Sequence, residues 1–179
     1  MRFIQFLNEA KEIPEVWYHG SNIEFNNFDL KYAITDKSIA LEGPGFYLTT
    51  DRDDAERYGK YIHKIELIRK TRIKKNTDKF RVGFAEKLIS EMPDKEDVLS
   101  NWDENPTKAM NKLRKTVLEF TRNVKEMINN IWYDCYKGFE KEFLKKLVEG
   151  GIDGMIVDRN DGVKHLICYN PDILKFIKD

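Results

Sequence analysis

The chain has 179 residues, 41% of them hydrophobic, which is enough to bury one substantial core and suits a single domain. Lys plus Arg and Asp plus Glu number 31 each, so a global electrostatic attraction to nucleic acid or to an anionic membrane is excluded. No apolar run approaches the roughly 20 residues of a membrane span, and we expect no membrane partner. Cys135 and Cys168 lie far apart without metal-ligand spacing. They favour two structural thiols in a reducing, cytoplasmic compartment over a disulfide or a metal site.

Residues 1–13 form an N-terminal segment with two interpretations. Phe3, Phe6 and Leu7 stand at helical spacing, which predicts an amphipathic helix. The segment has no small-residue cleavage site and no long apolar core, so it is not a secretory signal. It also resembles the head-targeting peptides of internal bacteriophage proteins, which are cut after Leu-x-Glu, because Leu7-Asn8-Glu9 has that form. This resemblance implies packaging in a phage head and delivery to the host cytoplasm, and both interpretations stay open.

Two strands and a turn come next. Residues 16–19 are aromatic and β-branched, and Gly20-Ser21 ends the strand that they predict. Residues 22–36 have no clean period, so we expect a loop with a turn of helix. Gly43-Pro44-Gly45 predicts a turn, and residues 46–48 predict a short strand after it.

A short helix and a longer strand follow. Asp51 is the expected N-cap of a helix through Tyr58, with Asp53 and Asp54 in its first turn, and Gly59 is expected to end it. Residues 61–68 alternate as a strand does, which predicts a sheet with one well-buried face. His63, on that strand, has no surrounding motif and is interpreted as a surface or structural residue.

Residues 70–149 are charged and helical. Phe80, Phe84 and Leu88 recur every fourth residue, which predicts a helix that ends before Pro93. Asn105 caps and Pro106 opens a longer predicted helix. Its apolar residues recur at spacings of three and four: Met110, Leu113, Val117, Phe120, Val124, Met127 and Ile131. We expect this helix to pack across a sheet or against the next helix, and the whole segment to contribute no catalytic group.

The C-terminal part predicts a hairpin. Gly150-Gly151 ends the last helix, and residues 155–157 are expected to pair with residues 166–169 through the turn Asn160-Asp161-Gly162. No internal repeat or linker interrupts the chain. We therefore predict one α+β domain over residues 1–179 with a helical insertion at residues 70–149.

Three motifs resemble those of the ADP-ribosyltransferase superfamily, in the H-Y-E branch that diphtheria toxin shares with the poly(ADP-ribose) polymerases. They are Tyr18-His19-Gly20-Ser21, Gly43-Pro44-Gly45-Phe46-Tyr47-Leu48-Thr49-Thr50 and Lys164-His165-Leu166-Ile167-Cys168-Tyr169-Asn170-Pro171. The resemblance covers residues 17–68 and 150–174. It implies a split mixed or antiparallel sheet as the core, and NAD as the substrate that the site binds.

The resemblance also implies roles for individual residues. Gly20 would offer its backbone N–H and C=O to the nicotinamide carboxamide, and Tyr47 and Tyr58 would lie on either side of the cationic ring. His19 would hydrogen-bond a hydroxyl of the adenosine ribose, assisted by Ser21. Taken singly, these residues also have structural interpretations: a core histidine, half-buried aromatics and turn glycines.

His165 stands where the family has its catalytic glutamate. A neutral imidazole accepts a hydrogen bond but adds no negative charge beside an oxocarbenium ion. We expect this departure to weaken the synthesis of ADP-ribose polymer most. The transfer of a single ADP-ribose unit should be weakened less, and NAD binding least. Asp161, in the hairpin turn, is the alternative carboxylate, although Asp-Gly pairs usually serve only the turn.

Three functions follow from these residues. The first is an NAD-dependent mono-ADP-ribosyltransferase, or NAD glycohydrolase, acting on a protein or nucleic-acid acceptor or on water, as a phage effector would. The second is a catalytically impaired NAD-binding or interaction module on the same scaffold. The third is a purely structural or partner-binding protein, in which the helical segment is the working surface and the Tyr18-His19-Gly20-Ser21 motif is accidental. The acceptor and the oligomeric state do not follow from the sequence.

Overall fold

A computed structural model describes residues 13–33, 42–69, 72–159 and 161–177. The N-terminal segment, with its two interpretations as a helix or a targeting peptide, therefore lies outside the described residues up to position 12. The same holds for the last three residues, 34–36, of the predicted loop.

Seven strands form one sheet in the order β4-β5-β6-β2-β1-β3-β7. Their bounds are Val16–Ser21 (β1), Phe46–Thr49 (β2), Tyr61–Leu67 (β3), Ile73–Lys75 (β4), Gly154–Asp158 (β5), Lys164–Cys168 (β6) and Leu174–Phe176 (β7). Only the edge pair β4–β5 is parallel, and every other neighbouring pair is antiparallel. The predicted α+β class with a mixed sheet is thus confirmed.

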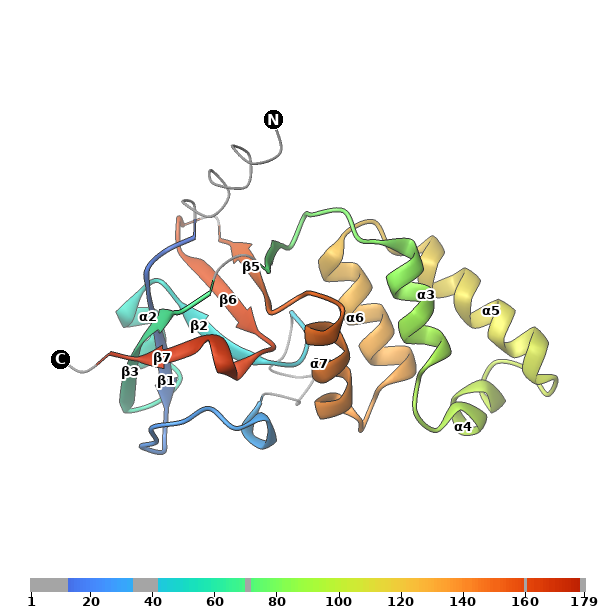
Figure 1. The fold of residues 1–179 in the computed structure, drawn as a ribbon, viewed down its shortest axis with the longest axis horizontal. Coiled ribbons are helices and arrows are strands. Elements are labelled where there is room, and N and C mark those ends of the chain that lie inside the picture. Colours follow the sequence, from blue (N-terminus) through green and yellow to red (C-terminus); the bar gives the residue numbers. More distant parts are fainter. Residues whose placement is uncertain (1–12, 34–41, 70–71, 160, 178–179) are drawn as a thin grey trace.

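Six α-helices accompany this sheet in the described part of the chain. Their bounds are Arg52–Glu56 (α2), Val82–Ser90 (α3), Lys95–Ser100 (α4), Pro106–Glu119 (α5), Val124–Cys135 (α6) and Glu140–Glu149 (α7), and two short 3-10 helices span Leu30–Tyr32 and Pro171–Ile173. Figure 1 shows the sheet with α2 at one end of an elongated molecule and helices α3 to α7 at the other.

The single long helix predicted from Pro106 through Ile131 is wrong, because the chain breaks between α5 and α6. Thr121 donates its hydroxyl to the carbonyl of Val117 at 2.6 Å. Asn123 then starts α6 by accepting a hydrogen bond from the backbone N–H of Glu126. Such side-chain bonds compete with continued helix, so the apolar periodicity runs through two helices.

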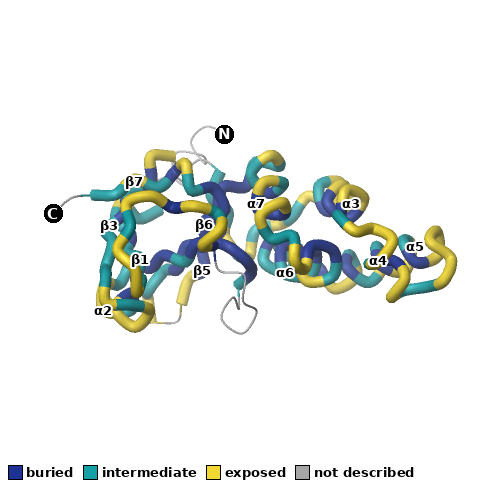
Figure 2. Tube along the Cα trace, turned by 90° about the horizontal axis from the view of Figure 1, so that it is seen from below, coloured by how far each residue is buried: buried dark blue, intermediate teal, exposed yellow. Residues whose placement is uncertain are grey.

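The helices pack mainly on one another. In Figures 1 and 2, α6 and α7 lie next to the strands, while α3, α4 and α5 lie beyond them. Tyr136, at the end of α6, donates its hydroxyl to the carbonyl of Leu88 on α3 at 2.9 Å. The stripe residues Leu113, Val117, Met127 and Ile131 are buried where α5 and α6 pack on each other and on α3, and α5 does not lie across the sheet. The expected partner, the helix α7 with Phe143, Leu144 and Leu147, contributes to the same core cluster.

Asp153 joins the two halves of the molecule at the start of β5. Its side chain is fully buried, accepts hydrogen bonds from Arg69 and Asn170, and lies 3.4 Å from the Nε of Arg72. Arg72 in turn donates to the carbonyl of Val148, on α7. This set of contacts connects the last helix, the edge strand and the strand that carries His165.

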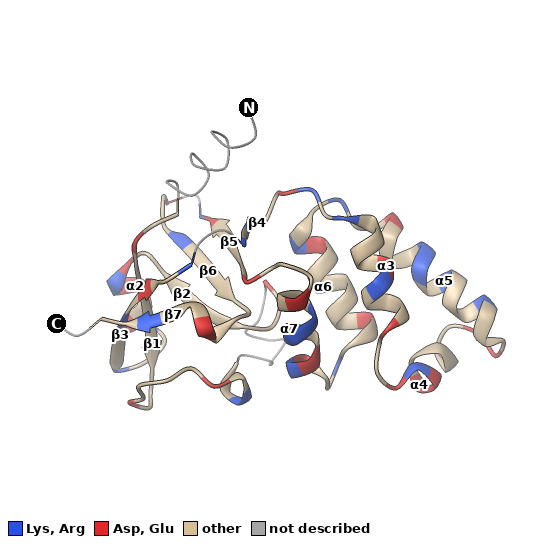
Figure 3. Cartoon of the chain, in the orientation of Figure 1, with Lys and Arg blue, Asp and Glu red and all other residues tan. Residues whose placement is uncertain are grey.

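Charges are spread evenly over the fold. Figure 3 shows basic and acidic residues interleaved along the helices and strands. The strands β1, β2 and β6, which carry the predicted site motifs, and the neighbouring helix α2 therefore do not stand out as a surface of one charge sign in Figure 3.

Candidate active site

A cavity of about 140 Å³ lies between β1, β2, β6 and α2. It is lined by His19, Gly20, Tyr47, Tyr58 and His165, all of which were predicted as site residues. The sixth predicted residue, Ser21, lines a second cavity of about 320 Å³, which His19 lines as well. His19 therefore stands between two cavities.

The register of the sheet brings the three motifs together. Tyr18 on β1 pairs with Thr49 on β2, and Thr49 pairs with His165 on β6. The first and third motifs, far apart in the chain, are thus separated by one strand. Tyr47 and His165 occupy neighbouring strands and face the same cavity.

His19 is held in one tautomer. Its Nδ1 lies 2.8 Å from the carbonyl oxygen of Tyr47, and because a carbonyl only accepts, Nδ1 carries the proton. Burial lowers the pKa of His19, so the ring is neutral at pH 7 and Nε2 keeps its lone pair. The edges of Phe25 and Phe28 contact the ring, with centroids 5.7 and 5.3 Å away. His19 can therefore accept a hydrogen bond from a hydroxyl group.

Tyr47 is fixed by the turn that precedes its strand. Its hydroxyl donates to the carbonyl of Gly43 at 2.7 Å and accepts from the backbone N–H of Glu42 at 3.2 Å. Burial raises the pKa of Tyr47, which keeps the phenol uncharged. The aromatic ring is thus oriented at its far end and presents its remaining surface to the cavity.

Helix α2 brings Asp54 to the cavity, and the turn that follows the helix brings Tyr58. Asp51 caps this helix as predicted, accepting from the backbone N–H of Asp53 at 2.9 Å, although the helix ends at Glu56, two residues before the predicted end. A side chain on Gly20 would place its Cβ 1.9 Å from the carbonyl oxygen of Ala55, so only glycine permits this packing.

His165 forms a hydrogen bond that the sequence analysis did not predict. Its Nε2 lies 2.9 Å from Oδ2 of Asp54, and both residues line the cavity. The side chains are only 11% and 14% exposed. In the helix that the sequence predicts through Tyr58, Asp54 and Tyr58 are four residues apart and share one face, and this was the signal that could have found Asp54.

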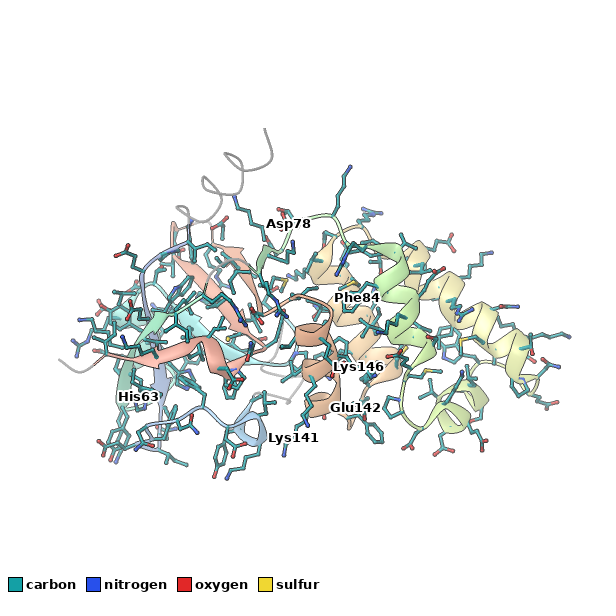
Figure 4. All side chains as sticks on the ribbon, viewed as in Figure 1. His63, Asp78, Phe84, Lys141, Glu142 and Lys146 are labelled. Atoms are coloured by element: carbon teal, nitrogen blue, oxygen red, sulfur yellow. The ribbon has the colours of Figure 1, made fainter. Side chains whose placement is uncertain are left out.

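The other candidate residues lie elsewhere. Asp161 accepts from the backbone N–H of Val163 and serves the hairpin turn, outside the cavity. His63 lies on β3 at the outer part of the sheet, with its ring 4.3 Å from that of Phe25, and burial lowers its pKa. Figure 4 shows His63 far from Phe84 and Lys146 of the helical part.

Neither a membrane-spanning helix nor a metal-binding cluster is found among the described residues. No helix there is both long and apolar enough to cross a bilayer. No three His, Cys, Asp or Glu side chains gather there as the ligands of a metal ion would.

The antiparallel strands β1 and β2 thus bring His19 and Tyr47 to one cavity. A family model described as "ADP-Ribosyltransferase in polyvalent proteins" matches residues 10–179. The chain therefore belongs to this ADP-ribosyltransferase family, which confirms the superfamily that the three motifs predicted.

Comparisons with individual proteins do not extend the family assignment. No curated protein matches the chain. Among solved structures, an anti-CRISPR protein is 13% identical, with 90% of this chain and 94% of that chain covered and a TM-score of 0.36. That similarity is too low to carry over a fold or a function.

Proposed function

We propose that the protein transfers a single ADP-ribose unit from NAD to a protein or nucleic-acid acceptor, and hydrolyses NAD slowly when water is the acceptor. The observation that carries this proposal is the convergence of His19, Gly20, Tyr47, Tyr58 and His165 on one cavity. Membership in the ADP-ribosyltransferase family supports the same reaction class.

The smaller cavity suits the nicotinamide end of NAD. Tyr47 and Tyr58 would hold the pyridinium cation by their aromatic faces, an interaction worth about 0.5 to 2 kcal/mol. Gly20 would hydrogen-bond the carboxamide through its backbone. These contacts orient the ring, which leaves as neutral nicotinamide when the C1′–N bond of the ribose breaks.

The larger cavity suits the adenosine end. It contains Phe25, Phe28 and Tyr32, which offer aromatic surface to a base, and Asp29. His19 lines both cavities, and its Nε2 lone pair is suited to accept a hydrogen bond from a ribose hydroxyl between the two ends.

A direct test is calorimetric titration of NAD into the wild type and into Tyr58→Ala. We expect the substitution to weaken binding by about 3- to 30-fold, because one aromatic face of the cation is lost. Tyr133→Ala is the matched control, since Tyr133 is 60% exposed on α6, away from both cavities, and Tyr58 is 55% exposed. Equal affinity in Tyr58→Ala and Tyr133→Ala, or no binding to the wild type, would contradict the proposal.

The product is proposed to be mono-ADP-ribosylation, because His165 replaces the glutamate that activates a ribose hydroxyl as the next acceptor in polymer-forming members of the H-Y-E branch. Labelled NAD and a host-cell extract give the measurement. Polymer made by the wild type would contradict this proposal.

The replacement at His165 also favours a second candidate, a catalytically impaired NAD-binding module. It differs from the first in one measurable way: it binds NAD without releasing nicotinamide.

We further propose, from the Leu7-Asn8-Glu9 sequence, that the enzyme is a bacteriophage effector acting in the host cytoplasm. Cleavage after Glu9 in mature phage heads, read by mass spectrometry, tests this proposal.

A further inference from the structure

We propose that Asp54 supplies the carboxylate that this site lacks on β6, and that it acts as a pair with His165. The inference rests on the NAD-dependent reaction proposed above and adds a residue to it. Asp54 comes from α2, a different element from the strand on which the family's glutamate lies, so the negative charge would reach the cavity from the helix rather than from β6.

The geometry supports a working pair. Oδ2 of Asp54 accepts the hydrogen bond from Nε2 of His165 at 2.9 Å, although 111 residues separate them. Both side chains are withdrawn from solvent and line the cavity that contains Tyr47 and Tyr58. A carboxylate in such surroundings interacts more strongly with its neighbours than one on the surface.

Other charged side chains also lie around this carboxylate: Arg159, which is exposed, and Glu42, which is paired with Lys125, line the same cavity. Arg57 lies 3.7 Å from Oδ1 of Asp54, but its side chain is 78% exposed, so solvent screens the contact. The helix cap does not use Asp54, because Asp51 provides it. The position of Asp54 is therefore not required for ending or starting α2.

The hydrogen bond also fixes the tautomer of His165. A carboxylate only accepts, so Nε2 carries a proton, and in the neutral ring the lone pair lies on Nδ1. A neutral Nδ1 can take a proton from an attacking group. The carboxylate then stabilises the imidazolium that forms, as it does in other carboxylate–imidazole pairs.

The transfer step balances with these groups. The acceptor hydroxyl, or water, gives its proton to Nδ1 of His165, and its oxygen forms a bond to C1′ of the nicotinamide ribose. The C1′–N bond breaks, and its electron pair returns to the ring, which leaves as neutral nicotinamide. Asp54 takes no proton. It is a positioning residue that holds His165 and offsets the positive charge that protonation creates on the imidazole ring of His165.

The test measures nicotinamide release from NAD by the full chain, with kcat and KM determined separately. We expect Asp54→Asn to lower kcat about 100-fold, the order found when one charged contact is lost from a preorganised site, and to leave KM within about threefold. Asp53→Asn is the matched control, because Asp53 is the neighbouring carboxylate and is exposed. Asp54→Glu should recover part of the lost kcat, since it restores a carboxylate.

A double variant separates the pair from a purely structural contact. His165→Glu alone brings two carboxylates together, and like charges at this distance oppose one another. Combining it with Asp54→Asn removes the repulsion and restores one carboxylate on β6. We expect the double variant to release nicotinamide at least about tenfold faster than His165→Glu alone, by the same charge argument.

Each outcome decides something. If the wild type releases nicotinamide and Asp54→Asn keeps its kcat, the pair is not part of the reaction, and the proposed function still stands. If the double variant is no faster than His165→Glu, Asp54 does not act on position 165 through its charge, and the proposed pair is overturned. If the wild type binds NAD but releases no nicotinamide, the pair is overturned and the NAD-binding module remains. No NAD binding overturns both proposals.

Discussion

At the scale of single residues, burial determines the charge state of the candidate site. His19 is neutral because burial lowers its pKa, and the carbonyl of Tyr47 fixes its proton on Nδ1. Desolvation likewise raises the pKa of the Tyr47 phenol. A neutral imidazole and a neutral phenol suit a site that binds a cationic ring, because neither repels it.

The lowered pKa of His19 predicts a pH dependence of stability. The unfolded chain takes up a proton near the usual value of 6.5 while the folded state resists it, so the unfolded state binds more protons in the window just below 6.5. The free energy of unfolding should therefore fall as the pH drops from 7 to 5, and His63, whose pKa is also lowered, should add to the fall.

Urea unfolding at pH 7 and pH 5 checks this expectation. His19→Gln should show a smaller loss between the two pH values than the wild type, because its side chain does not titrate. His63→Gln should do the same to a smaller extent, since His63 is less deeply buried. An equal loss in the wild type and both variants would mean that carboxylates account for the whole dependence.

At the scale of elements, the position of α2 decides the shape of the site. The helix is only five residues long, yet it contributes Asp54 and leads into Tyr58. It approaches β1 so closely that a Cβ on Gly20 would meet Ala55, and one on Gly59 would lie 2.1 Å from the backbone of Ser21. Two glycines therefore allow α2 and the turn after it to lie close against β1.

Replacing the first of them should separate the helix from the strand. Gly20→Ala creates a clash with backbone, which a side-chain rotation cannot relieve, and overpacking of this kind costs about 1 to 3 kcal/mol. We expect that loss in denaturant unfolding, together with loss of NAD binding as Tyr58 moves. Gly83→Ala is the control, because nothing lies within 4 Å of its added Cβ, and alanine in a helix should be neutral or stabilising.

At the scale of the whole molecule, sheet and helices share one hydrophobic core, and Asp153 ties them together. The core cluster runs from Trp17 and Ile65 in the sheet to Leu113 and Ile131 in the helices. Asp153 adds a buried charge at the junction, with two arginines and Asn170 around it. A buried charge of this kind is costly to disturb, because its partners lose their compensation.

Asp153→Ala should therefore lower the free energy of unfolding by about 3 kcal/mol or more, measured by urea denaturation. This loss lies at the low end of the range for breaking a buried ion pair, because the side chains of Arg69 and Arg72 are 45% and 33% exposed and can be solvated without Asp153. Asp158→Ala, at the other end of β5, is the control. Its side chain is 60% exposed in its pair with Lys164, so the loss should stay below about 1 kcal/mol.

Local signals in the sequence determined much of the fold. Alternation predicted β3, Asp51 and Asn105 predicted two helix starts, and the hairpin of β5 and β6 followed from its turn. These features depend on neighbours a few residues away, which sequence patterns report directly. The order of the three motifs also predicted the superfamily, because each motif is a short segment whose residues act together.

Tertiary structure alone decided the rest. The edge strand β4 has three residues and pairs with β5 across the chain, and the partner of His165 comes from a helix 111 residues away. Apolar periodicity could not reveal the break between α5 and α6, because both helices bury the same stripe. The sequence determined which residues could form a site, whereas the sheet register and the close approach of α2 decided that Asp54 joins them.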